Sequence, residues 1–446
     1  MLRNRYNMLR IFTSVVVIFL LSIAGCSNSD NPVDSGNQTA KIEGRVTGGS
    51  GFYKEGSLQK ADAMQDVQGA VVTVSRIKAD GSLEVVSKAS VETDVNGHFT
   101  VETNANNESN LLVEAVKGSS KWRAVVSAKT NSSSTITCPP VDDESTEEAN
   151  VYIRIKARGK ASSVNYADVK TYINADVAAQ IKSNVITEDQ AAASIEAEAE
   201  ARAKAYSESS INVTSAQAQT IADAKTNAEV QLESRLYSSG NSDTEVENAQ
   251  YAYLDAVINA YVQAGLSSDT YAKVITMSSQ AMVNTSASLN SNARFAIEKS
   301  AAKIKAYITA KATEKQFQDA GADQSRMNAV VNAGVALRAS IKGSQNSSDI
   351  DNAFVAFHSG IKTQLTAMMS TNATVINTVD STINSSAGAR AVLNLALSTA
   401  VTADAVVNAY AAFYSSVKTL VEGSLSSASS AEVKAATSTM ILVNAY

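Results

Sequence analysis

The amino-acid sequence predicts a multidomain protein with an N-terminal antiparallel β-sandwich at 41–158 and an all-α domain at 160–446. Three observations lead to this prediction. Apolar and polar residues alternate through the first part, with the period of two that is typical of strands. No proline, which disrupts helix interiors, follows Pro140, and apolar residues then recur every three or four positions. The length of 446 residues also exceeds what a single core supports. We expect the two parts to fold separately.

The first 25 residues have the composition of an export signal. Three arginines precede the apolar run 11–23, which is shorter than the roughly 20 residues that a stable membrane-spanning helix needs. The run ends in the sequence LSIAGC, whose cysteine is residue 26. This sequence resembles the lipobox of bacterial lipoproteins. An ordinary cleaved signal peptide with an incidental cysteine is the alternative.

The lipobox resemblance implies cleavage of residues 1–25 and attachment of lipid to the thiol of Cys26. The expected partner of the mature N-terminus is therefore the membrane, and the expected location is the bacterial cell envelope. Ser27 stands in place of the aspartate that retains Gram-negative lipoproteins at the inner membrane, so the outer membrane is favoured if the cell has two membranes. The polar composition of 26–40 predicts a flexible tether with a reach of about 20 Å.

Short strand-like segments fill the first structured part. They are 42–46, 69–74, 74–77, 83–86, 91–101, 111–115, 122–126 and 149–155. Asp80-Gly81 and Asn96-Gly97 are turn signals, and the second is expected to join two strands of a hairpin within 91–101. Seven or so short strands separated by turns are typical of an antiparallel sandwich.

Three motifs in this part resemble the carboxypeptidase regulatory-like, prealbumin-type domain of bacterial envelope proteins. They are Ile42-x-Gly44-x-Val46, Gly69-Ala70-x-Val72-x-Val74 and Thr93-Asp94-x-Asn96-Gly97-x-Phe99. The resemblance covers about 110 of the 446 residues. It implies a non-catalytic β-sandwich that serves as a spacer or interaction module. The insertion at 48–65 departs from that pattern.

Helix boundaries are visible in the second part. Thr187-x-x-Gln190 and Ser242-x-x-Glu245 have the pattern of capping boxes at helix starts. Four glycines stand where we expect helices to end in a left-handed residue: Gly240, Gly321, Gly343 and Gly423. The segments 246–264, 350–368 and 406–420 carry apolar residues at helical spacing.

An internal repeat relates two of these helices. The segments 352–363 and 408–419, which begin 56 positions apart, both follow the pattern Asn-Ala-aromatic-x-Ala-Phe. Weaker copies begin at 248 and 292. A unit of about 50 residues is the length of a two-helix hairpin, so the repeats predict either a multi-helix bundle or a short solenoid.

No catalytic, cofactor or metal site is expected. His98 and His358 are the two histidines and fall in different parts of the chain. The string from Glu92 to Asn96-Gly97 has calcium-loop spacing, but Thr103 occupies the position of the bidentate glutamate, so a simple turn is favoured. The carboxylate clusters at 142–148 and 188–200 are expected to be a solvated loop and a solvated helix face. Cys138 is expected to be a buried small hydrophobic residue.

Aromatic residues of the helical part are candidates for an interaction surface, although core positions are the more common use of such rings. The candidates are Tyr251, Tyr253, Phe357, Phe413 and Tyr414. With a net charge of −6 the sequence shows no footprint for nucleic acid. The expected function is structural or protein-interacting, with an unknown envelope protein as partner. The alternative is a surface protein that binds a sugar, peptide or apolar molecule in a groove of its helices.

Overall fold

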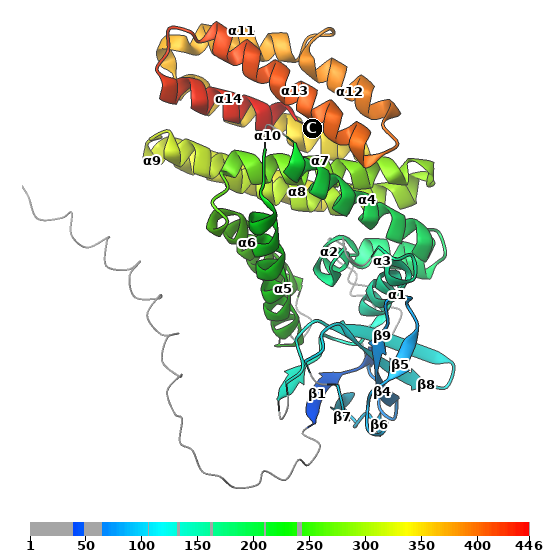
Figure 1. Ribbon diagram of the computed structural model, residues 1–446. Coiled ribbons are helices and arrows are strands. Elements are labelled where there is room, and N and C mark those ends of the chain that lie inside the picture. The colour runs from blue at the N-terminus through cyan, green and yellow to red at the C-terminus, as the bar shows by residue number, and fades with distance from the viewer. Residues whose placement is uncertain are drawn as a thin grey trace, which may run out of the picture. The chain divides into compact units, whose positions relative to one another are not determined.

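The computed structural model describes residues 39–48, 65–105, 107–131, 134–160, 164–208, 211–238 and 243–445. Strands come first and helices follow, which confirms the predicted fold class (Figure 1). Residues Thr39–Tyr446 form one compact unit. The predicted signal peptide, Cys26 and most of the tether lie outside the described residues, and so do Gly240, Ser242 and positions 49–64 of the insertion.

Ten strands are formed by the described residues. They are β1 (Ala40–Arg45), β2 (Thr47–Gly48), β3 (Gln65–Asp66), β4 (Val71–Ile77), β5 (Leu83–Val85), β6 (Val91–Glu92), β7 (His98–Thr103), β8 (Leu111–Lys117), β9 (Ser120–Val126) and β10 (Thr135–Thr137).

The strands form two main sheets that pack face to face. One has the order β10-β1-β7, and the other has the order β5-β4-β8-β9 with β6 paired to β4. Side chains from both sheets, including Ile42, Val74 and Val113, share one buried apolar cluster, as in a sandwich. The pairing is antiparallel except between β1 and β10, which run parallel. A short pair, β2 and β3, lies beside these sheets in the topology.

At two glycines of the family-like motifs, the geometry of the fold leaves no room for a side chain. Gly44 is paired with Phe99 across β1 and β7, and a Cβ at Gly44 would lie only 2.5 Å from that ring. Gly97 has a φ of +73°, and a Cβ there would lie 2.4 Å from the Val46 carbonyl oxygen. The Asn96-Gly97 turn is confirmed, but the predicted hairpin is wrong. β6 pairs with β4 while β7 pairs with β1, so this turn connects the two sheets.

The helices follow β10 in the chain. They are α1 (Asp143–Ala157), α2 (Tyr166–Tyr172), α3 (Ala175–Lys182), α4 (Glu188–Ser207), α5 (Ser215–Ser238), α6 (Asp243–Gln263), α7 (Ser268–Thr285), α8 (Ser291–Asp319), α9 (Gln324–Gly343), α10 (Ser347–Met368), α11 (Ala373–Ile383), α12 (Ala389–Thr399), α13 (Ala403–Ser424) and α14 (Ser430–Asn444). Two short 3₁₀ helices are Ser286–Ser288 and Ser370–Asn372.

The predicted strand at 149–155 is wrong, because this segment belongs to α1. A capping box between Asp142 and Ser145 starts the helix, and buried residues such as Ala149, Tyr152 and Ile155 then follow at helical spacing. The β region therefore ends at β10 rather than at Arg158. The carboxylates at 142–148, predicted to be in a solvated loop, lie at the cap and in the first turns of this helix.

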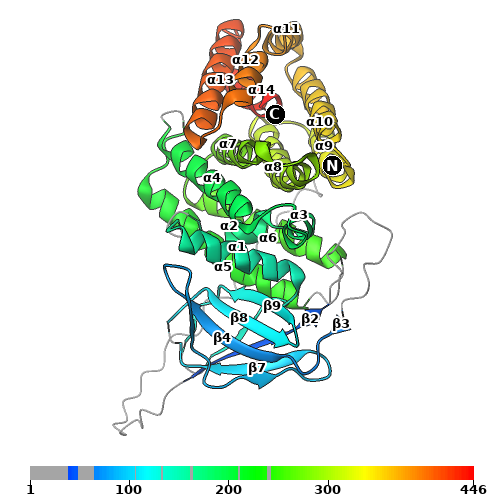
Figure 2. The same ribbon diagram turned by 90° about the vertical axis from the view of Figure 1, so that its right-hand side faces the viewer.

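Helix α1 covers an edge of the larger sheet, since β9 is its last strand (Figure 2). The Arg123 amide of β9 donates to the Thr146 hydroxyl at 2.9 Å, and the Ser145 hydroxyl donates to the Arg123 carbonyl at 2.8 Å. Side chains of α1 thus satisfy backbone groups that an edge strand would otherwise leave unpaired. These two hydrogen bonds attach α1 to the edge strand β9.

The outer face of the larger sheet belongs to the core of the helical part. Ile77, Leu112 and Val125 are buried in one apolar cluster with side chains of α1–α8. A second cluster joins α4 and α7–α14. The predicted separate folding of 41–158 and 160–446 stays a prediction, and this shared cluster argues against it.

The helices pack largely as antiparallel neighbours (Figures 1 and 2). Consecutive pairs in contact include α5 with α6, α7 with α8, α8 with α9, α9 with α10, and α12 with α13. α4 lies against α7, and α14 contacts both α10 and α13.

The predicted helix boundaries at the Thr187–Gln190 capping box and at the left-handed Gly321 are confirmed. Gly343 and Gly423 lie inside the last turns of α9 and α13 instead.

The repeat falls on α10 and α13, and its two copies bury equivalent positions. Phe357 and Phe413 are both buried in the second cluster, as predicted for core residues. Tyr414, a candidate for an interaction surface, is only 2% exposed. Its repeat equivalent His358 is also buried and contacts the Asp380 carboxylate through Nε2 at 2.7 Å. The shared burial supports a structural role for the repeat.

We predict that Phe357→Ala and Phe413→Ala each lower the free energy of unfolding by about 3–5 kcal/mol, because each change opens a cavity in the second cluster. Urea unfolding followed by circular dichroism measures the loss. Val355→Ala on the exposed side of α10 is the matched control, with a change within about 0.5 kcal/mol. Losses near zero for both phenylalanines would contradict the core assignment.

Candidate functional site

A cavity of about 150 Å³ lies where the start of α1 meets α2, α5, α6, α8 and α9. Its apolar lining comes from three of these helices and comprises Leu232, Leu236, Val246, Tyr253, Leu254 and Ile304. Charged side chains also line the cavity, and most of the acidic ones come from a different helix than most of the basic ones. Acidic residues come mainly from α1, and basic residues come mainly from α8 and α9.

The acidic side of the cavity is formed by Asp142, Glu144 and Glu148. Asp142 caps α1 by accepting from the Ser145 amide at 2.9 Å, and Glu148 accepts from Lys170 Nζ at 2.9 Å. Glu144 makes no hydrogen bond or ion pair with the residues that the structure describes. Burial and the neighbouring carboxylates raise the pKa of Glu144 well above its usual range, and burial raises the pKa of Asp142 to about 6.

The basic side is formed by Lys303 of α8 with Arg338 and Lys342 of α9. Lys342 Nζ lies 2.7 Å from the Glu247 carboxylate. Burial, together with Lys342, lowers the pKa of Lys303 to about 8. The wall also contains Lys170 of α2, which pairs with Glu148, and Glu247 of α6, which pairs with Lys342, so acidic residues predominate at α1 and basic residues at α8 and α9 without complete separation by sign.

The Arg338 guanidinium is held by two stacked rings. The centroids of Tyr251 and Tyr307 are 4.9 Å apart, and the guanidinium carbon lies 5.1 Å from each ring centroid. Tyr251 also donates its hydroxyl to Glu247 at 2.7 Å. The two cation–π contacts fix the orientation of the Arg338 guanidinium, and the hydrogen bond to Glu247 fixes the Tyr251 ring.

The structure divides the five candidate aromatics into two groups. Tyr251 and Tyr253 line the cavity, whereas Phe357, Phe413 and Tyr414 are buried in the second cluster. These three are therefore core residues, whereas the two tyrosines of α6 border the cavity.

Tyr253 carries an unsatisfied polar group. The residue is 4% exposed, and its hydroxyl has no hydrogen-bond partner among the described residues. The hydroxyl of the neighbouring Thr171 donates to the Ala167 carbonyl. A buried hydroxyl without a partner is costly, so this group is a candidate contact for a ligand or water.

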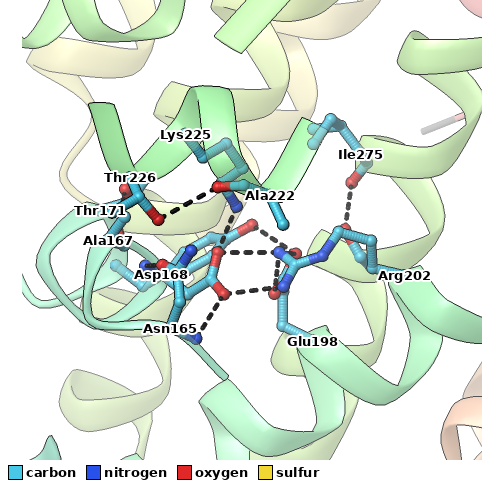
Figure 3. Close-up of polar contacts among 12 residues, drawn as sticks. Asn165, Ala167, Asp168, Thr171, Glu198, Arg202, Ala222, Lys225, Thr226 and Ile275 are labelled. Atoms are coloured by element: carbon cyan, nitrogen blue, oxygen red, sulfur yellow. Dashed lines mark hydrogen bonds and ion pairs between the residues drawn. The ribbon is translucent and has the colours of Figure 1, made fainter. Parts of the chain in front are cut away.

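A second polar centre joins α2, α4 and α5 (Figure 3). Arg202 forms a bidentate contact with Asp168, with nitrogen–oxygen distances of 2.9 and 2.7 Å, and it also contacts Glu198 at 2.9 Å. Lys225 pairs with Asp168 from α5. Burial raises the pKa of Asp168, but Arg202 and Lys225 outweigh it and hold that pKa well below its usual range.

This centre corrects the prediction of a solvated face at 188–200. Glu198 is fully buried beside Arg202, and Glu196 is buried and paired with Arg158. Glu200 alone among these three is exposed, where it pairs with Lys160. Sequence spacing shows the Glu198–Arg202 pair as neighbours on one turn, but Asp168 comes from a different helix and carries no local signal.

A third group of buried carboxylates surrounds Lys170. Glu148 contacts it directly, and the Tyr166 hydroxyl donates to the same carboxylate at 2.9 Å. Glu233 accepts from the Ser127 amide at 3.3 Å. Burial raises the pKa values of Glu229 and Glu233. This group closes the space between the sheet and α5.

The remaining candidate groups do not meet at a site. Cys138 is fully buried in the sandwich, as predicted, and burial raises the pKa of its thiol. His98 lies in β7 and His358 in α10. The described part of the chain contains no cluster of histidine, cysteine and carboxylate groups fit to hold a metal ion, and none of its helices is long and apolar enough to cross a membrane.

Comparison with known proteins finds no match to a family model, a curated protein or a solved structure. A role can therefore be assigned to each polar centre only from its geometry. The Asp168 centre is saturated with internal partners and suits a structural role. The cavity suits binding, because the buried Tyr253 hydroxyl in its wall has no hydrogen-bond partner among the described residues.

We predict that Arg202→Met lowers the free energy of unfolding by about 3–5 kcal/mol, because it leaves Asp168 and Glu198 buried with one cation instead of two. Denaturant unfolding measures the loss. Arg154→Met is the control, since it breaks an exposed pair with Glu188 and should cost about 1 kcal/mol or less. Equal small losses for the two variants would show that the buried centre contributes little.

We also predict that stability falls as the pH rises from about 4.5 to 7. Burial and repulsion by Glu188 raise the pKa of Glu147 to about 7, and the pKa of Asp142 is about 6. A carboxyl whose pKa is higher in the folded state holds its proton there at pH values where the unfolded chain has lost it. The stabilisation is therefore complete at low pH and is lost through this window.

The measurement is urea unfolding at pH 5 and pH 7. Glu147→Gln should reduce the difference between the unfolding free energies at pH 5 and pH 7 by about 1 kcal/mol. This value is reduced for solvent screening, because Glu147 is not fully buried. Glu422→Gln, at an exposed position of α13, should leave the difference unchanged. A pH dependence that Glu147→Gln does not alter would contradict the assignment.

Proposed function

We propose that the chain is a lipid-anchored protein of the bacterial cell envelope with a structural or protein-interaction role rather than a catalytic one. The observation that carries the proposal is the lipobox-like sequence ending at Cys26. More than one acyl chain on that residue would give stable membrane attachment, where a single chain gives marginal binding. In this proposal residues 40–137 act as a prealbumin-type spacer, and the outer membrane is the favoured location in a cell that has two.

The position of the anchor in the chain supports a spacer role. The chain enters its folded body at β1, in the sheet region, whereas α11–α13 lie at the opposite end of that body (Figures 1 and 2). By chain order, an anchor at Cys26 would be connected to this body through β1.

Exposed apolar residues at those helices support the interaction role. Val392 and Leu395, three positions apart on α12, are 60% and 71% exposed, and Val401 just beyond the helix is 83% exposed. Grouped apolar side chains on a surface commonly mark contacts with other proteins. Another envelope protein with an apolar surface is the partner that this proposal requires.

A second candidate function, binding of a small ligand, is favoured by the cavity. Tyr251 and Tyr253 line a concave space, which is the arrangement expected of aromatic residues in a binding site. Phe357, Phe413 and Tyr414 are packed in the core and offer no such surface. The two functions are compatible, because the cavity and the exposed face of α12 involve different helices.

Replacing Cys26 by serine tests the anchor. We predict that Cys26→Ser moves the protein from the membrane fraction to the soluble fraction and leaves its circular dichroism unchanged, because the change removes the site of lipid attachment and alters none of the residues that the structure describes. Cys138→Ala is the matched control and should stay membrane-bound, since its thiol is buried in the sandwich. Retention of Cys26→Ser on membranes after carbonate and salt washes would show the lipobox interpretation to be wrong.

A further inference from the structure

The cavity combines three chemical features that a single ligand would have to match. Carboxylates of Asp142, Glu144 and Glu148 lie on its α1 side. Lys303, Arg338 and Lys342 lie on its α8 and α9 side. Apolar side chains of α5, α6 and α8 line the space between. The cavity is thus neither uniformly acidic, basic nor apolar.

On the acidic side, two of the three carboxylates already have partners. Glu148 is paired with Lys170, and Asp142 is engaged in the cap of α1. Glu144 makes no hydrogen bond or ion pair with the described residues, although it lines the cavity. The nine-tenths-buried Tyr253 hydroxyl, which also has no partner among them, is a second and independent group that a ligand would satisfy.

Simple ligands of one charge type fit this wall poorly. A cation would meet the three basic side chains, and an anion would meet the carboxylates of α1. An uncharged apolar molecule would fill the centre but would leave Glu144 desolvated and without a partner. A molecule that carries both charges avoids each of these costs.

We propose that the cavity binds a small zwitterion, an amino acid or short peptide. The ligand's ammonium group contacts Glu144, and its carboxylate faces Lys303. Its carbon chain packs against Leu254 and Ile304, and the Tyr253 hydroxyl donates to or accepts from a polar atom of the ligand. This inference rests on the ligand-binding function proposed for the cavity, and it does not depend on membrane anchoring.

The test is calorimetric titration of the full-length protein in detergent with unbranched zwitterions from glycine to 6-aminohexanoate, and with leucine and leucyl-leucine. The unbranched series measures the separation of charges that the cavity prefers. Hexylamine and hexanoate, which each retain one charge, are the matched probes. We expect at least one zwitterion to bind about tenfold or more tightly than either of them, since each lost charged contact removes a charge-assisted bond.

Variants place the ligand in the cavity. Glu144→Gln and Lys303→Gln should each weaken binding of the preferred zwitterion by about tenfold. Glu422→Gln and Lys434→Gln, at exposed positions of α13 and α14, are the matched controls and should leave it unchanged. Circular dichroism of each variant verifies folding. If a cavity variant does not fold, the comparison of zwitterions with hexylamine and hexanoate on the unaltered protein still tests the ligand class.

The outcomes separate the ligand class from the binding function itself. Hexylamine or hexanoate binding as tightly as the zwitterions, with both cavity variants weakening it, would overturn the zwitterion assignment and keep the binding function. Zwitterion binding that neither cavity variant alters would overturn the placement of the ligand. No binding of any probe at millimolar concentration would overturn both the ligand class and the ligand-binding function.

Discussion

Paired charges buried among α1, α2, α4 and α5 fix how these first helices pack beside the sheet. Asp168 of α2 is held by Arg202 of α4 and Lys225 of α5, so three different helices are fixed at one point. Glu148 of α1 is paired with Lys170 of α2 in the same region. An ion buried without its partner costs several kcal/mol, about as much as a large part of a domain's net stability. These helices therefore have few alternative arrangements.

The cavity is a consequence of the same arrangement. Helix α1 is attached to β9 through Ser145 and Thr146, and α2 is attached to α1 through Lys170. The helices α6, α8 and α9 approach this junction from the other side and bring Tyr253 and Lys303 with them. The wall of the space between them therefore contains paired groups such as Glu148 and Lys170 together with the unpartnered Tyr253 hydroxyl. That space is where a ligand would complete the polar contacts.

Local patterns predicted much of the fold, and long-range pairing accounts for what they missed. Periodicity identified most strands and helices, and the repeat placed Phe357 and Phe413 in the core. The alternation of Val151 with its neighbours predicted a strand, but the capping box at Asp142 and burial against β9 select a helix. The burial of Asp168 depends on Arg202 and Lys225, two tertiary partners that no local spacing shows. The cavity escaped prediction for the same reason, because its lining comes from helices that meet only in the fold.

The central claim is that the sheet and the helices around it are one cooperative unit, joined by α1 and a shared apolar cluster. The single tryptophan, Trp122, lies in β9, so its fluorescence reports on the sheet, whereas far-ultraviolet circular dichroism reports on the helices. Urea unfolding followed by both signals tests the claim most directly. The account predicts that the fluorescence transition of Trp122 coincides with a loss of helical signal. A complete fluorescence transition with the helical signal fully retained would contradict it.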